Sequence, residues 1–450
     1  MMFVCLFIKF DIMKVRTLVI VFFFSLISYS QSVDVLAKEF ITYLDVNVSK
    51  AYADYLDETF KAKVKESQLE NIWKQLEGAY GNFIIGKFIC IDSIGENKQV
   101  FIDCKFEKSS LIINSVFNSS KKIVGFFIVA EASCEKKEYL NPSYVKQKRF
   151  NETEMSFRSE NYKMFGSLVL PKKMKPKTPI FIFVHGSGPN DRDETIGPNK
   201  IFKDLAYGLA TKGIASLRYD KRTYLYKDSI NGKDIHKEVL NDVSSAIKWI
   251  KSQTEFKDSP ILIIGHSLGA YLAPLIAKQN IEVKGIVMLA GNCRPLEDLI
   301  KEQFHYLFHL SSKSSVEMSD EIINIEKKYV YIKNNLSKNS PTNKLPLNIP
   351  ASYWLSMKLY DQKDVISKLM VPIFVLQGER DYQVTMTDFE LWNNTMKDKA
   401  NYSSKAYKKL NHLFLEGEGK LVPAEYMNKS NVPKYIIEDI FIWLKKQNNL

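Results

Sequence analysis

Apolar and polar residues follow two different periods in the first third of the chain. From residue 32 to about residue 83, apolar positions recur at intervals of three and four, which predicts amphipathic helices. Beyond them, short segments alternate apolar with polar positions and are separated by turn residues; these are residues 88–91, 100–106, 111–117 and 123–130. Helices followed by strands with short turns predict a small α+β domain.

From about residue 150 the pattern changes to short apolar runs that alternate with amphipathic stretches. Helices are predicted at residues 201–210, 235–249 and 436–444, after a leading hairpin at 155–157 and 165–170. Buried strands are predicted at residues 180–184, 214–219, 261–264, 283–289, 373–376 and 406–407. This order predicts an α/β fold, a doubly wound and mostly parallel sheet with helices on both faces.

The strand–helix rhythm fails between residues 292 and 368, which predicts a helical cap inserted over the strand ends. A polar segment at residues 136–149 is typical of a linker. The predicted organisation is therefore a small α+β domain over residues 31–135, this linker, and a large domain over residues 150–450 that contains the cap.

The N-terminus has the pattern of a secretory signal peptide over residues 1–30. Lys14 and Arg16 precede a short apolar run, and the small residues Ser28 and Ser30 stand before a cleavage site at Gln31. We expect an exported protein, periplasmic or secreted, with no stable membrane span once the signal is removed. An uncleaved anchor helix is the alternative, and either Met1 or Met13 is the start.

The net charge of +12 comes mostly from scattered lysines. Without an arginine-rich tract or an alternation of basic and aromatic residues, a solvated lysine-rich surface is favoured over nucleic-acid binding. An anionic partner, such as a cell-wall polymer or a lipid head group, stays open.

Cysteine spacing gives little indication of a metal or a disulfide scaffold. No C-x-x-C or His/Cys cluster is present, so no metal site is expected. Cys90 and Cys104 either pair across a hairpin or are buried free thiols. Removal of the signal would leave four cysteines, which are Cys90, Cys104, Cys134 and Cys293.

The most informative motif is Gly-His-Ser-Leu-Gly at residues 265–269, between a predicted strand and a predicted helix. In that context G-x-S-x-G forms a tight turn that exposes the serine at the carboxyl edge of the sheet. Ser267 is therefore the predicted nucleophile. The alternative is a serine that merely caps an ordinary helix.

A nucleophilic serine needs a base and an acid that orients the base. His412 is the predicted base, because it follows a late strand close to the C-terminus. Asp381, after the strand at residues 373–376, is the predicted acid; Glu379 is its competitor and is more readily explained as a turn residue paired with Arg380. The other histidines fit other positions and roles; they are His185, His236, His266, His305 and His309.

An oxyanion hole is expected from two backbone N–H groups. One belongs to Leu268, the residue after the nucleophile. The second comes from the Gly-rich segment at residues 185–189, where Ser187 is the first choice and Gly186 the next.

Taken together, the motifs H-G-x-G-P, G-H-S-L-G, G-x-x-D and N-H, in this order over about residues 150–450, resemble those of α/β-hydrolases. Residues 185–193 and 217–222 resemble bacterial esterases of the dienelactone-hydrolase and serine-aminopeptidase-like branch. The resemblance implies an acyl-enzyme mechanism on small carboxylic esters without a cofactor. Dienelactone hydrolases themselves use a cysteine nucleophile, so their substrate is not implied. The first domain resembles the NTF2-like domains that precede exported bacterial hydrolases.

Charged residues are concentrated after the Gly-rich segment. Asp191, Arg192, Asp193, Asp220 and Arg222 either form a network that rigidifies the oxyanion loop or belong to a solvated charged loop. Peptidase, thioesterase or acyltransferase activity on the same triad, and a non-catalytic binding role, are the alternative functions. The sequence does not indicate the physiological substrate or the oligomeric state.

Overall fold

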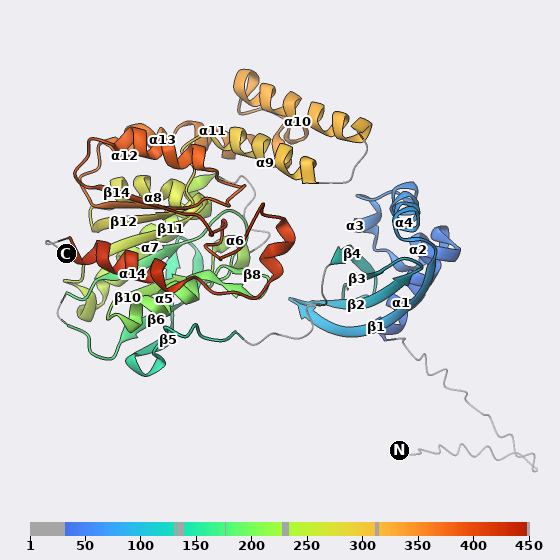
Figure 1. The fold of residues 1–450 in the computed structure, drawn as a ribbon, viewed down its shortest axis with the longest axis horizontal. Helices are drawn as coiled ribbons and strands as arrows, with labels where there is room; N and C mark the ends of the chain where they lie inside the picture. The colour runs from blue at the N-terminus through green and yellow to red at the C-terminus, as the bar shows by residue number, and fades with distance from the viewer. Residues whose placement is uncertain are drawn as a thin grey trace, which may run out of the picture. The chain divides into compact units, whose positions relative to one another are not determined.

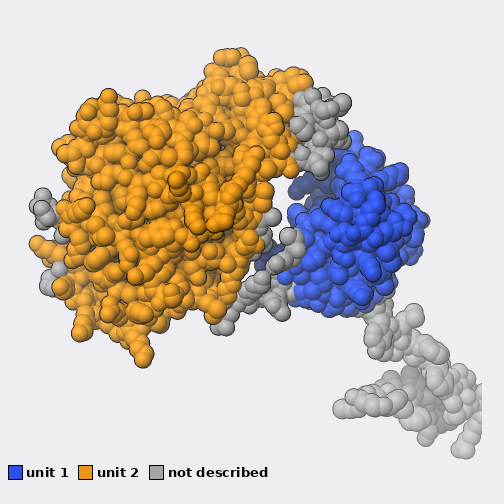
Figure 2. All heavy atoms as spheres, viewed as in Figure 1, with its two compact units in different colours: residues 1–136 blue, residues 137–450 orange. Residues whose placement is uncertain are grey.

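The structure is a computed structural model that describes residues 32–129, 132, 139–175, 177–226, 234–310 and 315–447. The chain divides into two compact units, residues 1–136 and residues 137–450 (Figure 2). The predicted signal peptide lies outside the described residues. In the described part of the chain, no helix combines the length and the hydropathy that a bilayer span requires.

The first unit folds as helices followed by an antiparallel sheet of order β1-β2-β3-β4 (Figure 1). Its elements are α1 (Val33–Val46), α2 (Val48–Tyr55), α3 (Glu58–Lys61), α4 (Glu66–Tyr80), β1 (Phe83–Ile94), β2 (Asn97–Phe106), β3 (Ser110–Phe117) and β4 (Ile123–Val129). The core includes Phe40 of α1, Trp73 of α4 and Ile102 of β2. This unit confirms the predicted small α+β architecture, although β1 is longer than predicted because it pairs with β2 from end to end.

Cys90 and Cys104 do not pair with each other. Cys90 lies opposite Phe101 in the β1–β2 register, whereas Cys104 lies opposite Gly86. Cys90 is disulfide-bonded, and Cys104 is a buried free thiol.

The second unit is built on an eight-stranded sheet of order β14-β13-β12-β11-β7-β10-β6-β5. The strands are β5 (Phe150–Ser159), β6 (Tyr162–Pro171), β7 (Ile180–Val184), β10 (Ala215–Tyr219), β11 (Ile261–His266), β12 (Val283–Leu289), β13 (Ile373–Gly378) and β14 (Tyr402–Tyr407). The leading β5–β6 hairpin pairs antiparallel with β10, and all later pairings are parallel. The predicted mostly parallel sheet is confirmed.

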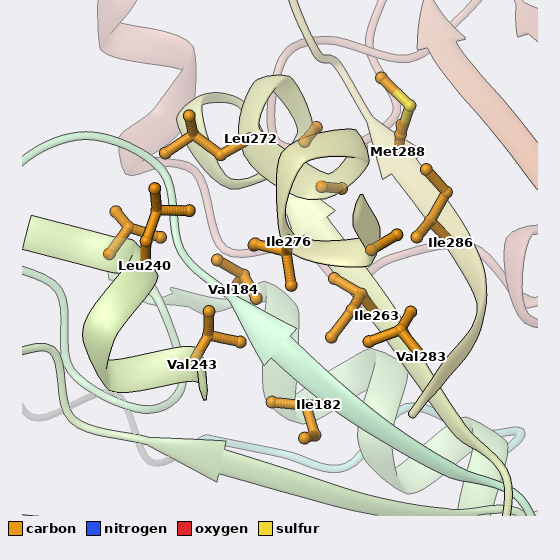
Figure 3. Close-up of a cluster of buried hydrophobic side chains, with 14 of the residues drawn as sticks. Ile182, Val184, Leu240, Val243, Ile263, Leu272, Ile276, Val283, Ile286 and Met288 are labelled. Carbon is orange, nitrogen blue, oxygen red and sulfur yellow. The ribbon is translucent and has the colours of Figure 1, made fainter. Parts of the chain in front are cut away.

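Both faces of this sheet are covered by helices, which explains the continuous apolar runs of its strands. Alternate residues of β7 enter two different cores: Ile182 and Val184 face one, and Phe181 and Phe183 face the other. Figure 3 shows the first core, in which Ile182 and Val184 lie beside residues of the helices on that face. The first face carries α7 (Asn241–Ser252), α8 (Leu268–Gln279) and α13 (Met386–Met396), and the second carries α5 (Ile201–Thr211) and α14 (Lys434–Lys445).

Within the described residues, four α-helices separate β12 from β13, in the region where the sequence predicts a cap. They are α9 (Leu296–Leu310), α10 (Ser315–Asn335), α11 (Ala351–Lys358) and α12 (Gln362–Ser367). Ile300, Ile332, Leu345 and Trp354 form a small core of their own among these segments. The described part of the polar segment before β5, residues 139–149, belongs to the second unit, within which Tyr144 donates a hydrogen bond to the Val432 carbonyl at 2.7 Å.

Candidate active site

Ser267 occupies the turn between β11 and α8 with strained backbone angles, φ 51° and ψ −114°. Such a conformation is unfavourable for a residue with a side chain. The two flanking glycines make the turn possible. A Cβ on Gly265 would lie 2.3 Å from the Gly269 carbonyl oxygen, and a Cβ on Gly269 would lie 2.0 Å from the Val184 oxygen. The strand, the turn and the helix therefore pack too closely for any larger residue at these two positions.

Asp381 and His412 lie in direct contact beyond the ends of β13 and β14. His412 Nδ1 is 2.6 Å from Asp381 Oδ2, and both side chains are buried. The other oxygen of Asp381 accepts hydrogen bonds from the backbone N–H groups of Gln383 at 2.7 Å and Val384 at 3.0 Å. These bonds fix the carboxylate so that His412 Nδ1–H donates to it, which leaves Nε2 as the free acceptor of the ring.

His266, next to the serine, also contacts His412. Its Nε2 donates to the His412 carbonyl oxygen at 2.8 Å, and the two rings are 4.8 Å apart between centroids. Within the described residues, Ser267 Oγ has no hydrogen-bond partner. The structure therefore joins Asp381 to His412 directly, and it links the turn that carries Ser267 to His412 through His266.

Glu194 lies on the other side of His266. Its Oε1 is 3.1 Å from His266 Nδ1, and both side chains are 2% exposed. Burial lowers the pKa of His266, but the Glu194 carboxylate outweighs burial and raises the pKa overall. The Glu194 carboxylate therefore favours the protonated form of His266. Local spacing could not predict this pair, because 72 positions separate its members.

Of the backbone N–H groups predicted to form the oxyanion hole, one already has a hydrogen-bond acceptor in the described part of the chain and two do not. The Gly186 N–H already donates to Glu194 Oε1 at 2.7 Å, so this second-choice donor is occupied. Among the described residues, neither Leu268 N–H nor Ser187 N–H has an acceptor. A Cβ on Gly186 would lie 3.2 Å from Ser267 Cβ, so this segment runs directly beside the serine.

The charged residues after the Gly-rich segment form a partly buried network. Arg192 binds Asp220 through Nη2 at 2.8 Å and Glu154 through Nη1 at 2.6 Å. Asp193 pairs with Arg218, whose side chain is 1% exposed. Burial raises the pKa of Asp193, but Arg218 and the neighbouring lysines lower it by more.

Two members of the predicted network have other partners. Arg222 pairs with Asp242 of α7 and with Glu160 of the β5–β6 turn, not with the loop, because it begins α6 (Arg222–Leu225) and leaves the direction of β10. Asp191 accepts the backbone N–H groups of Asp193 and Thr195 and so closes a local turn.

The remaining sequence candidates lie away from this centre or are otherwise engaged. Glu379 is exposed, and the expected pairing with Arg380 is not found because Arg380 binds Glu425 at 2.5 Å. His185 is buried at the end of β7, where burial lowers its pKa to about 4. His305 lies on α9, 3.2 Å from Glu326.

Helix α9 is fastened to the turn that carries Asp381. The rings of Tyr306 on α9 and Tyr382 stack with 4.7 Å between centroids. Gln303 donates to the Gln383 carbonyl at 2.8 Å. Among the described residues, no group of three or more His, Cys, Asp or Glu side chains is arranged to hold a metal ion.

Comparison with known protein families gives two matches along the chain. A family described as "Protein of unknown function (DUF3887)" matches residues 37–126, within the first unit. A family described as "Serine aminopeptidase, S33" matches residues 198–419, a span that includes Ser267, Asp381 and His412.

Individual relatives are esterases by name. Esterase EstD of Thermotoga maritima is 36% identical over 388 residues, which cover 86% of this chain and 89% of that protein. Among solved structures, Est1E from Butyrivibrio proteoclasticus is 16% identical with a TM-score of 0.42, covering 64% of this chain and 97% of its own. The esterase Pf2001 of Pyrococcus furiosus is 16% identical with a TM-score of 0.43, covering 69% and 95%.

Proposed function

The chain belongs to the α/β-hydrolase family that includes Esterase EstD, and from this premise we propose that it hydrolyses carboxylic esters by nucleophilic catalysis at Ser267. The observation that carries the proposal is the buried 2.6 Å contact between Asp381 and His412, whose carbonyl His266 links to the strained strand–helix turn of Ser267. Asp381 is itself fixed by two backbone N–H donors, which suits a carboxylate that must orient a catalytic base.

In the proposed first half-reaction, Ser267 Oγ attacks the ester carbonyl carbon while His412 Nε2 takes the hydroxyl proton. The C–O bond to the alcohol then breaks, and His412 returns the proton to the leaving oxygen. The acyl group remains on Ser267. Asp381 holds the ring orientation and stabilises the imidazolium without itself taking the proton.

In the second half-reaction, water attacks the acyl carbonyl and gives its proton to His412. As the second tetrahedral intermediate collapses, the bond between Ser267 Oγ and the acyl carbon breaks, His412 returns the proton to Ser267 Oγ, and the carboxylic acid is released. The negative charge on the substrate oxygen is received by Leu268 N–H and Ser187 N–H, the two predicted donors that lack acceptors within the described residues. Gly186 is the weaker candidate, because Glu194 holds its N–H.

The proposal extends to location and organisation. Residues 1–30 are proposed to act as an export signal, which the disulfide at Cys90 supports, because such bonds persist mainly in oxidising compartments. Residues 292–368 are proposed to act as the cap over the site. The first unit is proposed to be an accessory domain of NTF2-like type.

The first test is hydrolysis of a series of p-nitrophenyl esters beside aminoacyl p-nitroanilides, by the wild type and by Ser267→Ala. We expect ester turnover that falls by at least about 10⁴-fold in the variant, because the nucleophile is lost. Ser404→Ala, at an exposed serine of β14, is the matched control and should retain wild-type rates.

Other outcomes have definite meanings. Cleavage confined to the anilides would replace the esterase with a peptidase, the activity named in the matching family description. Full ester activity in Ser267→Ala would show that Ser267 is not the nucleophile.

A further inference from the structure

The peptide unit between Gly186 and Ser187 is held by charged side chains on both sides. The Gly186 N–H, just before it, donates to Glu194 Oε1 at 2.7 Å. The Gly186 carbonyl oxygen accepts a hydrogen bond from Lys221 Nζ, also at 2.7 Å. Both charged side chains are buried, with Glu194 and Lys221 each 2% exposed. A buried lysine bound to a backbone carbonyl is costly to desolvate, so its position calls for an explanation.

Other donors reinforce the same orientation. The Asn190 side-chain amide donates to the Gly186 carbonyl at 3.3 Å and to the Ser187 carbonyl at 3.1 Å. Thr223 Oγ1 donates to the Gly188 carbonyl at 3.1 Å. The carbonyl groups of this loop are therefore fixed by protein donors one after another.

Because the peptide bond is planar, the hydrogen bond to the Gly186 carbonyl also determines the direction of the Ser187 N–H. In a trans peptide the C=O and the following N–H point in opposite directions within one plane. Lys221 therefore fixes the Ser187 N–H as well, and directs it away from Lys221. Ser187 N–H is also the group left without an acceptor in the described part of the chain.

Both clamping charges are neutralised by partners outside the loop. Lys221 Nζ is 2.6 Å from Glu238 Oε1, and that glutamate is also buried. Glu194 is balanced by His266, which in turn donates to the His412 carbonyl at 2.8 Å. The loop is therefore linked to the proposed base, His412, through the buried side chains of Glu194 and His266.

We propose that Lys221 and Glu194 are positioning residues that fix the Gly186–Ser187 peptide as one arm of the oxyanion hole. This inference rests on the proposed esterase function. Lys221 touches neither the nucleophile nor the base; it acts through the peptide, whose polarisation by the ammonium group also strengthens Ser187 N–H as a donor.

The test is Lys221→Met, which keeps the length of the side chain and removes the donor. Complete loss of one oxyanion donor lowers kcat by roughly 10²–10³-fold, so a misplaced donor should lower it by about 10–100-fold. We expect KM to stay within about threefold, because the contact strengthens mainly in the transition state. Affinity for a trifluoromethyl ketone, which forms a tetrahedral adduct on the serine, should fall by the same factor as kcat/KM.

Lys251→Met is the matched control. Lys251 also donates to backbone carbonyls, those of Lys257 at 3.0 Å and Ser259 at 2.9 Å, but it lies on α7. It should leave kcat and inhibitor affinity unchanged. Rates are normalised to the fraction of sites titrated by a fluorophosphonate, so that a loss of folded protein is not counted as a loss of rate. If Lys221→Met does not fold, Lys221→Gln, which retains a donor, replaces it. The kcat of Lys221→Gln should lie between the kcat of the wild type and that of Lys221→Met.

Two outcomes would overturn the inference while the function stands. One is a normalised kcat of Lys221→Met and Lys221→Gln equal to that of an active wild type. The other is a change confined to KM. A wild-type protein that neither turns over p-nitrophenyl esters nor incorporates a fluorophosphonate at Ser267 would instead overturn the proposed function, and the clamp with it.

Discussion

The acid turn around Asp381 and the loop at residues 186–195 both connect to His266, the residue before Ser267, but their charged side chains have different kinds of partner. Asp381 is held by the Gln377 amide, two backbone N–H groups and His412. Within the described residues, no lysine or arginine forms an ion pair with it. In the loop, by contrast, Arg192, Asp193 and Glu194 each have a partner of opposite charge.

The difference shows how one buried site serves two electrostatic tasks. Neutral donors stabilise a carboxylate without cancelling its charge, so Asp381 keeps its full attraction for an imidazolium at His412. In the loop, ion pairs cancel the charges of Arg192, Asp193 and Glu194, and the free groups beside the serine are backbone N–H dipoles. The first arrangement suits the acid of a triad, and the second suits an oxyanion hole.

The largest expected effect comes from breaking the acid side. Asp381→Asn should lower kcat by about 10⁴-fold, because the amide no longer holds the required tautomer of His412 or stabilises its charged form. Steady-state ester hydrolysis measures the loss, and circular dichroism checks that the fold is retained. Glu379→Gln, at the exposed residue two positions earlier, should stay within about twofold of wild type. If the two results are reversed, the acid is Glu379.

The next effect comes from breaking the loop side. Arg218→Met should lower the free energy of unfolding by about 3–5 kcal/mol, because it leaves buried Asp193 without its arginine partner. Urea unfolding followed by tryptophan fluorescence measures the free energy of unfolding of the second unit, because every tryptophan except Trp73 lies in that unit. Lys368→Met, which removes an exposed pair with Asp364, should cost less than about 0.5 kcal/mol. Equal costs in the two variants would show that the loop pairs do not support the fold.

A smaller effect, a pH-dependent change in stability, is expected at Asp204, a second buried carboxylate that is held by neutral donors. Asp204 on α5 is buried and is bonded by Tyr139, Asn431 and the Val432 N–H, all neutral. Burial raises its pKa from 3.8 to about 6, whereas the pKa of ion-paired Asp193 is lowered. Neutral donors alone therefore do not offset the burial of a charge at Asp204.

The sign of the pH effect follows from this shift. The folded chain binds the Asp204 proton more tightly than the unfolded chain does, so the stabilising contribution is complete below about pH 4 and is lost as the pH rises through about 6. Relative to Asp204→Asn, the wild type should lose about 3 kcal/mol of stability between about pH 4 and pH 7. Urea unfolding of both proteins across this range measures the difference. A difference that does not change with pH would contradict the raised pKa.

Local spacing predicted much of this molecule. The apolar runs gave the strands of the parallel sheet, because a strand buried on both faces carries no polar alternation. The turn at Ser267 was predictable because two glycines, a strand and a helix are contiguous in the chain. Asp381 and His412 were put forward by their order after late strands, and the structure holds them 2.6 Å apart.

Other features depended on residues that the chain brings together from far apart. The sequence left Cys90 and Cys104 open as a pair, but the register of β1 and β2 sets them opposite other residues. It grouped Arg222 with the loop charges, but the start of α6 turned that side chain toward Asp242.

What the sequence by itself determined is the order of elements and the candidate nucleophile, because both depend on hydrophobic periodicity and on glycines within a few residues. What only the tertiary structure decided is which charges meet. Lys221 reaches the Gly186 carbonyl across 35 positions, and His266 reaches the His412 carbonyl across 146. The packing of β7, β10 and β11 determines which buried charges pair. Hydrophobic periodicity along the chain does not predict these pairs.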